Sequence, residues 1–399
     1  MTPVITLRPT VPASRKPVPP GDGGGGGAPV RAVRGALRHA APALLGYLAV
    51  RALGLLVLAR WTHLKGHGVW PALATSWDSR WYLEIADRGY QAHLGTLLDD
   101  NNLAFFPFYP ALIKAVAAVT PGSRASVGLV IAVVCSLLAA WGIFAVGDRL
   151  HGRRTGTVLA VLWGAQPVAL VQWMGYTESL FTALTAWALY AVLDGRWYAA
   201  GALAVAAGLT RPTGIAVAAA VTVAALLSAA RGGGRTPLLA ALLAPVGWFG
   251  YIGWVALRLG RWDGYFAVQK LWRNEWDGGT RTLRELRDHL VYGRDPQLFL
   301  AMVSLVLLGS LFLYVLCLAD RQPAALLVFA GALLLVVLGS GGVYFPRARF
   351  LLPGFPLLLP VAVAVARARP HVAALVLGVA AVTSAWLGGY MLMVWPGPP

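Results

Sequence analysis

Charged residues and cysteines are scarce in this sequence. Charged side chains make up 12% of its 399 residues, where about 25% is typical of soluble domains, and 58% of the residues are apolar. This composition excludes a disordered chain and argues against a soluble protein of two domains. Cys135 and Cys317 lie far apart inside apolar runs, so we expect neither a disulfide framework nor a cysteine-based metal site.

Common nucleotide-binding and hydrolase motifs are also missing. The sequence has no Walker-type phosphate loop, Rossmann glycine fingerprint, HExxH or GxSxG motif, and the glycine run at residues 23–27 is low-complexity sequence. It has no DxD motif either, because Asp99 and Asp100 are merely adjacent. These absences argue against an enzyme that uses ATP or a nucleotide sugar. We therefore expect no required cofactor and no metal site, although the sequence does not exclude a divalent metal.

The apolar residues are concentrated in runs bounded by a charge, a proline or a glycine. A helix needs about 20 apolar residues to cross the hydrocarbon core, at 1.5 Å per residue. The sequence therefore predicts an all-α, polytopic integral membrane protein with about 11 transmembrane helices. The predicted spans are 41–59, 126–146, 156–174, 179–193, 197–210, 213–229, 237–257, 297–318, 322–339, 350–366 and 371–393.

The remaining sequence divides into a tail and two long polar stretches. Residues 1–40 are rich in proline, glycine and arginine, which predicts a disordered tail with no cleaved signal peptide, ahead of a transmembrane domain over residues 41–395. Polar stretches at about 60–103 and 258–296 interrupt the spans. Residues 105–119 are apolar but short, and whether they cross the membrane decides the side on which every later loop lies.

The distribution of arginine settles this choice through the positive-inside rule. If residues 105–119 do not cross, the tail and most arginine-rich turns share one side: Arg149, Arg153, Arg154, Arg196, Arg231, Arg235, Arg321, Arg367 and Arg369. We therefore predict a cell-membrane protein with a cytoplasmic N-terminus and an interfacial helix at 105–119. The external loops are then 60–125, 176–178, 211–212, 258–296 and 340–349. Much of the net charge of +17 then lies on the cytoplasmic tail and turns, where it anchors the chain. We therefore expect no nucleic-acid partner.

The first external loop contains an amphipathic block at residues 77–90. Read as a helix, it places Trp77, Trp81 and Ile85 on one face, which predicts an interfacial helix. The opposite face is charged: Arg80, Glu84, Asp87 and Arg88. Glu84 is four residues from two arginines, so an ion-paired, solvated face is the simpler interpretation of it.

Asp78 allows two interpretations. It lies near the expected helix start, where a carboxylate caps the first turn. It is also close to Trp77 and Trp81, which would partly desolvate it and raise its basicity, as a functional carboxylate requires.

Three other external loops also carry isolated charges. Glu178 either stabilises a helix N-terminus, where its negative charge meets the positive end of the dipole, or has a functional role. Arg211 either extends its charge to the membrane interface or binds an anion. Arg347 and Arg349 follow a glycine-rich turn, and a pair of guanidinium groups suits phosphate. These arginines break the charge bias of the other short external loops, which favours a binding role for them.

Four blocks, in this order, resemble the PIG-V-type mannosyltransferases. This family of GT-C membrane glycosyltransferases adds the second mannose in GPI-anchor assembly and has bacterial relatives. The blocks are residues 77–90 (Trp-Asp-Ser-Arg-Trp-Tyr-Leu-Glu-Ile-Ala-Asp-Arg-Gly-Tyr), 104–110, 176–181 and 209–214. The resemblance covers roughly residues 41–366, without the tail or the 258–296 loop. It implies a GT-C fold in which the 60–125 loop is catalytic.

The implied reaction transfers a hexose, by family analogy mannose, from a polyprenyl-phosphate sugar to an acceptor hydroxyl, with inversion, on the outer leaflet. By resemblance Asp78 is the general base, Glu178 the second acidic position and Arg211 a basic position. We add Arg347 and Arg349 as donor-phosphate ligands on chemical grounds. The expected substrate-binding residues are Trp77, Arg80, Trp81, Tyr82, Glu84, Asp87 and Tyr176.

The expected partners are membrane lipids, the lipid-linked donor, and a glycan, glycolipid or protein acceptor. Two other functions stay open at this point. A transporter or lipid flippase would show internal repeats and midplane charges, of which Arg51 is the clearest candidate. A non-catalytic assembly subunit is the other alternative, because a sequence cannot show whether the loop carboxylates converge.

Overall fold

A computed structural model describes residues 28–293 and 297–399. The described residues form helices and no strand beyond one isolated β-bridge. They divide into two units at residues 39 and 40, and the arrangement below is that of the second unit, Ala40–Pro399. Residues 28–40 belong to helix α1 (Ala28–Leu64) and not to a disordered tail, so this part of the prediction is wrong. Alanine, leucine and arginine favour helix there, and Pro29 falls in the first turn.

Apolar helices occupy the predicted spans, and the all-α membrane fold is confirmed. Five are long and apolar enough to cross a membrane: α1, α5 (Arg124–His151), the continuous pair α10 (Thr236–Leu243) and α11 (Val246–Leu259), α14 (Leu298–Ala319) and α18 (Pro370–Met393). Shorter apolar helices fill most of the other spans: α7 (Glu178–Leu193), α8 (Trp197–Gly208), α9 (Gly214–Ala230), α15 (Ala324–Gly339), and η4 (Phe355–Leu358) with α17 (Leu359–Arg367).

The predicted span at 156–174 is broken. It forms α6 (Arg153–Gly164) and the short η2 (Ala169–Trp173), because Pro167 cannot continue the helix. The carbonyls exposed at the break are bound by side chains: Gln172 Nε2 donates to Trp163 O (2.9 Å), and Arg51 Nη2 donates to Gly164 O (2.5 Å). Arg51 is 1% exposed, so its guanidinium is buried where it caps the broken helix.

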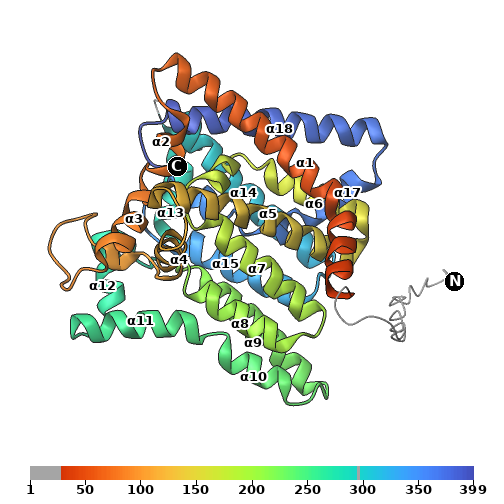
Figure 1. The fold of residues 1–399 in the computed structure, drawn as a ribbon, viewed down its shortest axis with the longest axis horizontal. Helices are drawn as coiled ribbons and strands as arrows, with labels where there is room; N and C mark the ends of the chain where they lie inside the picture. The colour runs from red at the N-terminus through yellow and green to blue at the C-terminus, as the bar shows by residue number, and fades with distance from the viewer. Residues whose placement is uncertain (1–27, 294–296) are drawn as a thin grey trace. The chain divides into compact units, whose positions relative to one another are not determined.

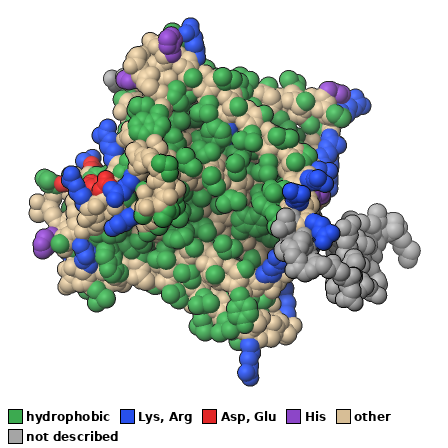
Figure 2. All heavy atoms as spheres, in the orientation of Figure 1, with side chains coloured by type: hydrophobic (Ala, Val, Ile, Leu, Met, Phe, Trp, Pro, Cys, Tyr) green, Lys and Arg blue, Asp and Glu red, His purple; other side chains and the backbone are tan. Residues whose placement is uncertain are grey.

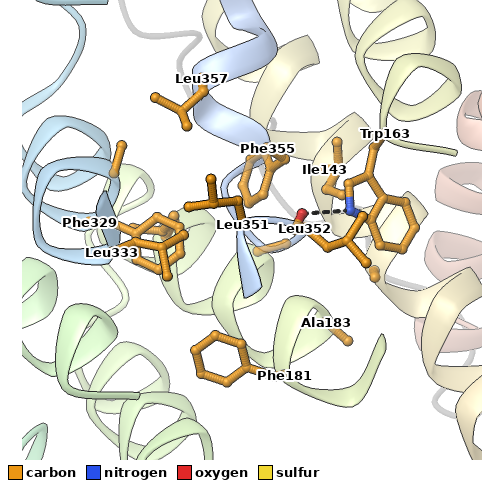
Figure 3. Packing of buried hydrophobic residues seen from close by; sticks show 14 of the residues in the cluster. Ile143, Trp163, Phe181, Ala183, Phe329, Leu333, Leu351, Leu352, Phe355 and Leu357 are labelled. Carbon is orange, nitrogen blue, oxygen red and sulfur yellow. Dashed lines mark hydrogen bonds between the residues drawn. The ribbon is translucent and has the colours of Figure 1, made fainter. Parts of the chain in front are cut away.

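The centre of the bundle is packed around the turn that follows α16 (Arg347–Phe350). Figure 3 shows Leu351, Leu352 and Phe355 enclosed by side chains of α5, α6, α7 and α15, with the indole of Trp163 directed at the turn. Trp163 Nε1 donates to Leu352 O at 3.0 Å. The short α16 is therefore held at the edge of the core by the residues that follow it.

Small residues allow several helices to approach closely. A side chain on Gly156 of α6 would overlap the backbone of α5, and one on Gly247 of α11 would overlap Val205 O of α8. Inside lipid, the hydrophobic effect does not drive helices together. Van der Waals packing at close backbone contacts of this kind stabilises their association instead.

We expect Gly247→Ala to lower the free energy of unfolding by about 1–3 kcal/mol, because the added Cβ would lie closer than 3.0 Å to the α8 backbone. Thermal unfolding in detergent measures the effect. Gly250→Ala is the matched control, since it lies in the same helix with nothing within 4 Å of the added atom. Equal stability of the two variants would contradict the packing argument.

The predicted interfacial helices lie together at one end of the bundle. Residues 77–90 form α3 (Asp78–Arg88), and residues 105–119 contain α4 (Phe108–Ala117), about 15 Å long and too short to cross. Figure 1 places them on the left with α2 (Val69–Ala74), α12 (Gly264–Leu271) and α13 (Thr280–Arg287). The short η1 (Asn102–Ala104) precedes α4, and η3 (Asp288–Tyr292) follows α13. In Figure 2 the acidic side chains gather at this end, beside a broad hydrophobic surface.

Candidate active site

Asp78 is the first residue of α3. The chain turns sharply into the helix at Trp77, whose φ of 47° is rarely adopted by a tryptophan. Trp77 occupies the N-cap position, so the interpretation of Asp78 as a capping residue is wrong. Instead, Asp78 Oδ2 accepts a hydrogen bond from Arg349 Nη2 at 2.6 Å, and the carboxylate keeps 24% of its side chain exposed.

Arg349 lies in α16 and joins two carboxylates. Besides Asp78, its Nε is 3.6 Å from Glu178 Oε1, and only 5% of the side chain is exposed. The guanidinium also packs on the rings of Tyr176 (5.0 Å) and Phe350 (5.2 Å). Burial alone would lower the pKa of Arg349, but Asp78 and Glu178 hold it above its usual value. Arg349 is therefore a permanent cation between two anions.

Glu178 and Arg211 complete the cluster. Arg211 Nη1 is 2.6 Å from Glu178 Oε1, with 9% and 2% of the side chains exposed. Arg211 Nη1 also donates to Thr177 Oγ1 (3.3 Å) and lies over the ring of Phe350 (5.3 Å). Glu178 begins α7, so it also favours the positive end of the helix dipole. The charges alternate through the buried cluster, from Asp78 to Arg349 to Glu178 to Arg211.

Several buried polar atoms around this cluster have no hydrogen-bond partner among the described residues. They are Arg349 Nε, Arg349 Nη1, Tyr176 OH and Ser79 Oγ. Buried donors are normally paired, so these atoms mark positions where polar groups of a substrate can bind. A buried arginine whose Nη1 has no hydrogen-bond partner among the described residues, next to a partly exposed carboxylate, suits a substrate that has both an anionic group and a hydroxyl.

Comparison with known proteins finds mannosyltransferases among the similar sequences. The family described as dolichyl-phosphate-mannose-protein mannosyltransferase matches residues 106–254. GPI alpha-1,6-mannosyltransferase 2 is 32% identical over 144 residues in Rattus norvegicus and 31% identical over 144 residues in Mus musculus. Each match covers 33% of this chain and 28% of the relative. The matched part of the chain is therefore similar to mannosyltransferases.

A solved structure has a similar fold. ArnT from Cupriavidus metallidurans, bound to undecaprenyl phosphate, aligns with a TM-score of 0.52 and 15% identity, covering 81% of this chain and 60% of ArnT. The match with the mammalian relatives thus covers less than a third of their length, and the alignment with ArnT covers three-fifths of that protein. Glu178 and Arg211 lie inside the family match, whereas Asp78 and Arg349 lie outside it.

Arg347 does not join the charged cluster. All three of its nitrogens bind the protein itself: Nη2 donates to Ser340 O (2.6 Å) and Gly342 O (3.1 Å), Nε to Val343 O (3.4 Å), and Nη1 to Thr282 Oγ1. The predicted pair of arginines is therefore divided. Arg349 faces the carboxylates, whereas Arg347 stabilises the turn that precedes it.

The predicted aromatic ligands mainly hold the site together. Trp81 stacks on Phe105 with ring centroids 5.7 Å apart, and the buried Tyr82 places its hydroxyl 3.1 Å from Thr177 Oγ1. These contacts fix α3 against α4 and α7. Tyr176 lies beneath Arg349, and its hydroxyl is one of the atoms without a partner. Of the predicted aromatic ligands, Tyr176 is the best placed to contact a substrate.

The other charges of α3 lie outside the cluster. Asp87 forms an ion pair with Arg124, and Arg80 Nε donates to Thr75 O at 3.1 Å. Within the described part of the chain, Glu84 has no ion pair with Arg80 or Arg88, so the predicted solvated pairing is wrong. The Arg80 side chain instead points back towards the residues before the helix, so it does not pair with Glu84 four residues later.

The sequence did not indicate three residues of the site: Ser79, Thr177 and Phe350. Ser79 and Thr177 lie inside the matched blocks next to acidic residues, and this adjacency was the available signal. Phe350 directly follows Arg349 and presents its ring to both arginines. No sequence pattern could have indicated that one ring serves two cations from different loops.

Proposed function

We propose that this chain is a glycosyltransferase that moves mannose from a polyprenyl-phosphate sugar to an acceptor hydroxyl. The observation that carries the proposal is the contact between Asp78, partly exposed, and Arg349, buried and incompletely hydrogen-bonded. A carboxylate next to a cation provides the two groups that this reaction needs. One removes a proton from the acceptor, and the other binds the leaving phosphate.

In the proposed reaction, Asp78 accepts the proton of the acceptor hydroxyl as its oxygen bonds to the anomeric carbon of the sugar. The bond from that carbon to the phosphate oxygen breaks, and polyprenyl phosphate leaves with the electron pair. Arg349 and Arg211 neutralise the charge on the phosphate, with Nη1 of Arg349, which has no hydrogen-bond partner among the described residues, as a donor. Attack opposite the leaving group inverts the anomeric centre.

The pairing of Asp78 with Arg349 gives the donor a second role. The phosphodiester of the donor carries one negative charge, and its leaving phosphate gains a second as the bond to the sugar breaks, so it can compete with the carboxylate for the guanidinium. When the donor phosphate engages Arg349, the 2.6 Å bond to Asp78 is weakened and the carboxylate can turn towards the acceptor. Glu178 keeps Arg349 and Arg211 in place throughout, because it is 2% exposed and contacts both arginines.

The relatives support the donor class. The matching family is described by dolichyl-phosphate-mannose, and the ArnT structure contains undecaprenyl phosphate. The charge distribution of the loops supports a site on the outer face of the cell membrane, with the N-terminus in the cytoplasm. The reaction as proposed uses arginine in place of a metal, and its acceptor is a hydroxyl of a glycan, a glycolipid or a protein.

The test uses purified full-length protein in lipid nanodiscs with radiolabelled undecaprenyl-phosphate mannose and a panel of acceptors. We expect label to move from the lipid to an acceptor, equally well in the presence of EDTA. Transfer from GDP-mannose without the lipid donor would overturn the proposal. Uptake of the labelled lipid into proteoliposomes without any transfer would instead favour a transporter or flippase.

A further inference from the structure

The second external loop contains a segment that touches both sides of the site. Residues 272–282, here named the bridging segment, follow α12 and run into α13. They lie outside the family match and outside the four blocks of the sequence resemblance. Their contacts reach the first external loop in one direction and residues 338–347, just before Arg349, in the other.

Trp272 forms the contact with the first external loop. Its Nε1 donates to Asn101 O at 2.9 Å, and its ring meets Trp81 and Phe105 edge-on, with centroids 5.4 Å apart in both cases. Because Trp81 belongs to α3, this contact links the bridging segment to the helix that begins with Asp78.

The opposite contact is made largely by backbone. Gly341 N donates to Glu275 O (2.6 Å), Asp277 N donates to Gly339 O (3.2 Å), and Trp276 and Ser340 form the isolated β-bridge. These bonds pair the bridging segment with residues 339–341 over a short antiparallel stretch. The turn that leads to Arg349 is thus supported by a neighbouring strand-like segment.

The glycines of this turn are explained by the same contact. A Cβ on Gly339, Gly341 or Gly342 would lie closer than 3.0 Å to Trp276, Asp277 or Asn274, respectively. All three glycines are therefore required by the close approach of the bridging segment. The glycine-rich turn is therefore a packing feature of this contact.

Thr282 and Arg347 lie at the centre of this contact. Thr282 is 4% exposed, and its hydroxyl donates to Leu338 O (2.6 Å) while accepting from Arg347 Nη1. Arg347 in turn binds the carbonyls of Ser340 and Gly342. One hydroxyl and one guanidinium therefore tie both ends of the turn together, two residues before Arg349.

We propose that Arg347 is a positioning residue, which together with Thr282 fixes the turn so that Arg349 is held in place for the donor phosphate. The inference rests on the proposed function, because it assumes that Arg349 binds that phosphate. It assigns to the bridging segment a role in donor affinity, although the segment contributes no side chain to the charged cluster.

The test compares Thr282→Val with Thr282→Ser in the purified full-length protein. Valine has nearly the same shape but removes both hydrogen bonds, whereas serine keeps the hydroxyl. We expect Thr282→Val to raise the Kd for undecaprenyl phosphate about tenfold at unchanged binding stoichiometry, since the lost bonds include a charge-assisted one. The donor KM should rise in parallel. Thr282→Ser should stay within about twofold of wild type.

Two further variants distinguish positioning from general damage. Thr222→Val removes a similar bond, from Thr222 Oγ1 to Ala241 O (3.2 Å), between α9 and α10, and should leave the Kd unchanged. Gly341→Ala disturbs the same contact from the opposite side and should weaken binding, which provides a second test if Thr282→Val does not fold.

Three results would overturn the inference: an unchanged Kd in Thr282→Val, an equal loss in Thr282→Ser, or an equal loss in Thr222→Val. A fall in stoichiometry at constant Kd would indicate misfolded protein, and in that case an unchanged Kd in Gly341→Ala would overturn the inference. Wild-type protein that fails to bind undecaprenyl phosphate would overturn the proposed function and this inference together.

Discussion

Replacement of Asp78 by asparagine is expected to lower sugar transfer by about 10²- to 10⁴-fold, the usual contribution of a general base. Asparagine keeps the shape of the side chain but cannot accept the proton of the acceptor hydroxyl. The measurement is transfer from radiolabelled undecaprenyl-phosphate mannose in nanodiscs. The variant should still insert and fold, because Glu178 continues to balance the buried charge of Arg349.

Binding measurements make this test more specific. Without the carboxylate at 2.6 Å, Arg349 loses a competitor for the donor phosphate, so Asp78→Asn should bind undecaprenyl phosphate at least as tightly as wild type. Asp87→Asn is the matched control in the same helix, since Asp87 pairs with Arg124 at an exposed position and should retain transfer within about twofold. Full transfer by Asp78→Asn would refute the assignment of the base.

The second large effect concerns stability. Glu178→Gln should lower the free energy of unfolding by about 3–5 kcal/mol, because it removes the carboxylate from a buried ion pair and leaves the charge of Arg211 unbalanced. Arg349 would lose the same contact at 3.6 Å. Thermal unfolding of the detergent-solubilised protein should show a clear decrease in Tm relative to wild type.

Two comparisons test the reason for this loss. Asp194→Asn removes a partly exposed pair with Arg196 (2.7 Å), for which about 0–1 kcal/mol is expected. The double variant Glu178→Gln with Arg211→Gln should recover part of the stability, because it removes the unpaired charge as well. A Glu178→Gln variant as stable as Asp194→Asn would show that the cluster does not depend on Glu178.

Some parts of the fold could be predicted because they depend on local sequence. The helices that begin near 124, 178, 197, 214, 298, 324 and 370 match the predicted spans closely, since hydropathy and flanking charges define each of them separately. The break after α6 was missed although Pro167 marks it. Inside an apolar run, a proline kinks or ends a helix depending on which neighbours bind the freed carbonyls, here Arg51 and Gln172.

The same limit applies to the arginines near the C-terminal end of the sequence. Arg347 and Arg349 are chemically equivalent in the sequence, and a phosphate pair was a reasonable expectation. Their roles differ because Thr282 and two turn carbonyls are within reach of Arg347, whereas Asp78 is within reach of Arg349. The bridging segment that makes this difference shows no motif, because most of its contacts use backbone atoms and glycines.

By itself, the sequence determined that this protein is an all-α membrane protein, which of its loops carry acidic and basic residues, and which family its blocks resemble. These properties follow from composition, hydropathy and short motifs, all of them local. Only the tertiary structure decided which charges meet. Asp78 and Arg349 are separated by 271 residues, and their 2.6 Å contact exists because helix packing brings four separate loops to one end of the bundle. A buried charge requires a partner, and the packing of the loops places Arg349, not Arg347, next to Asp78.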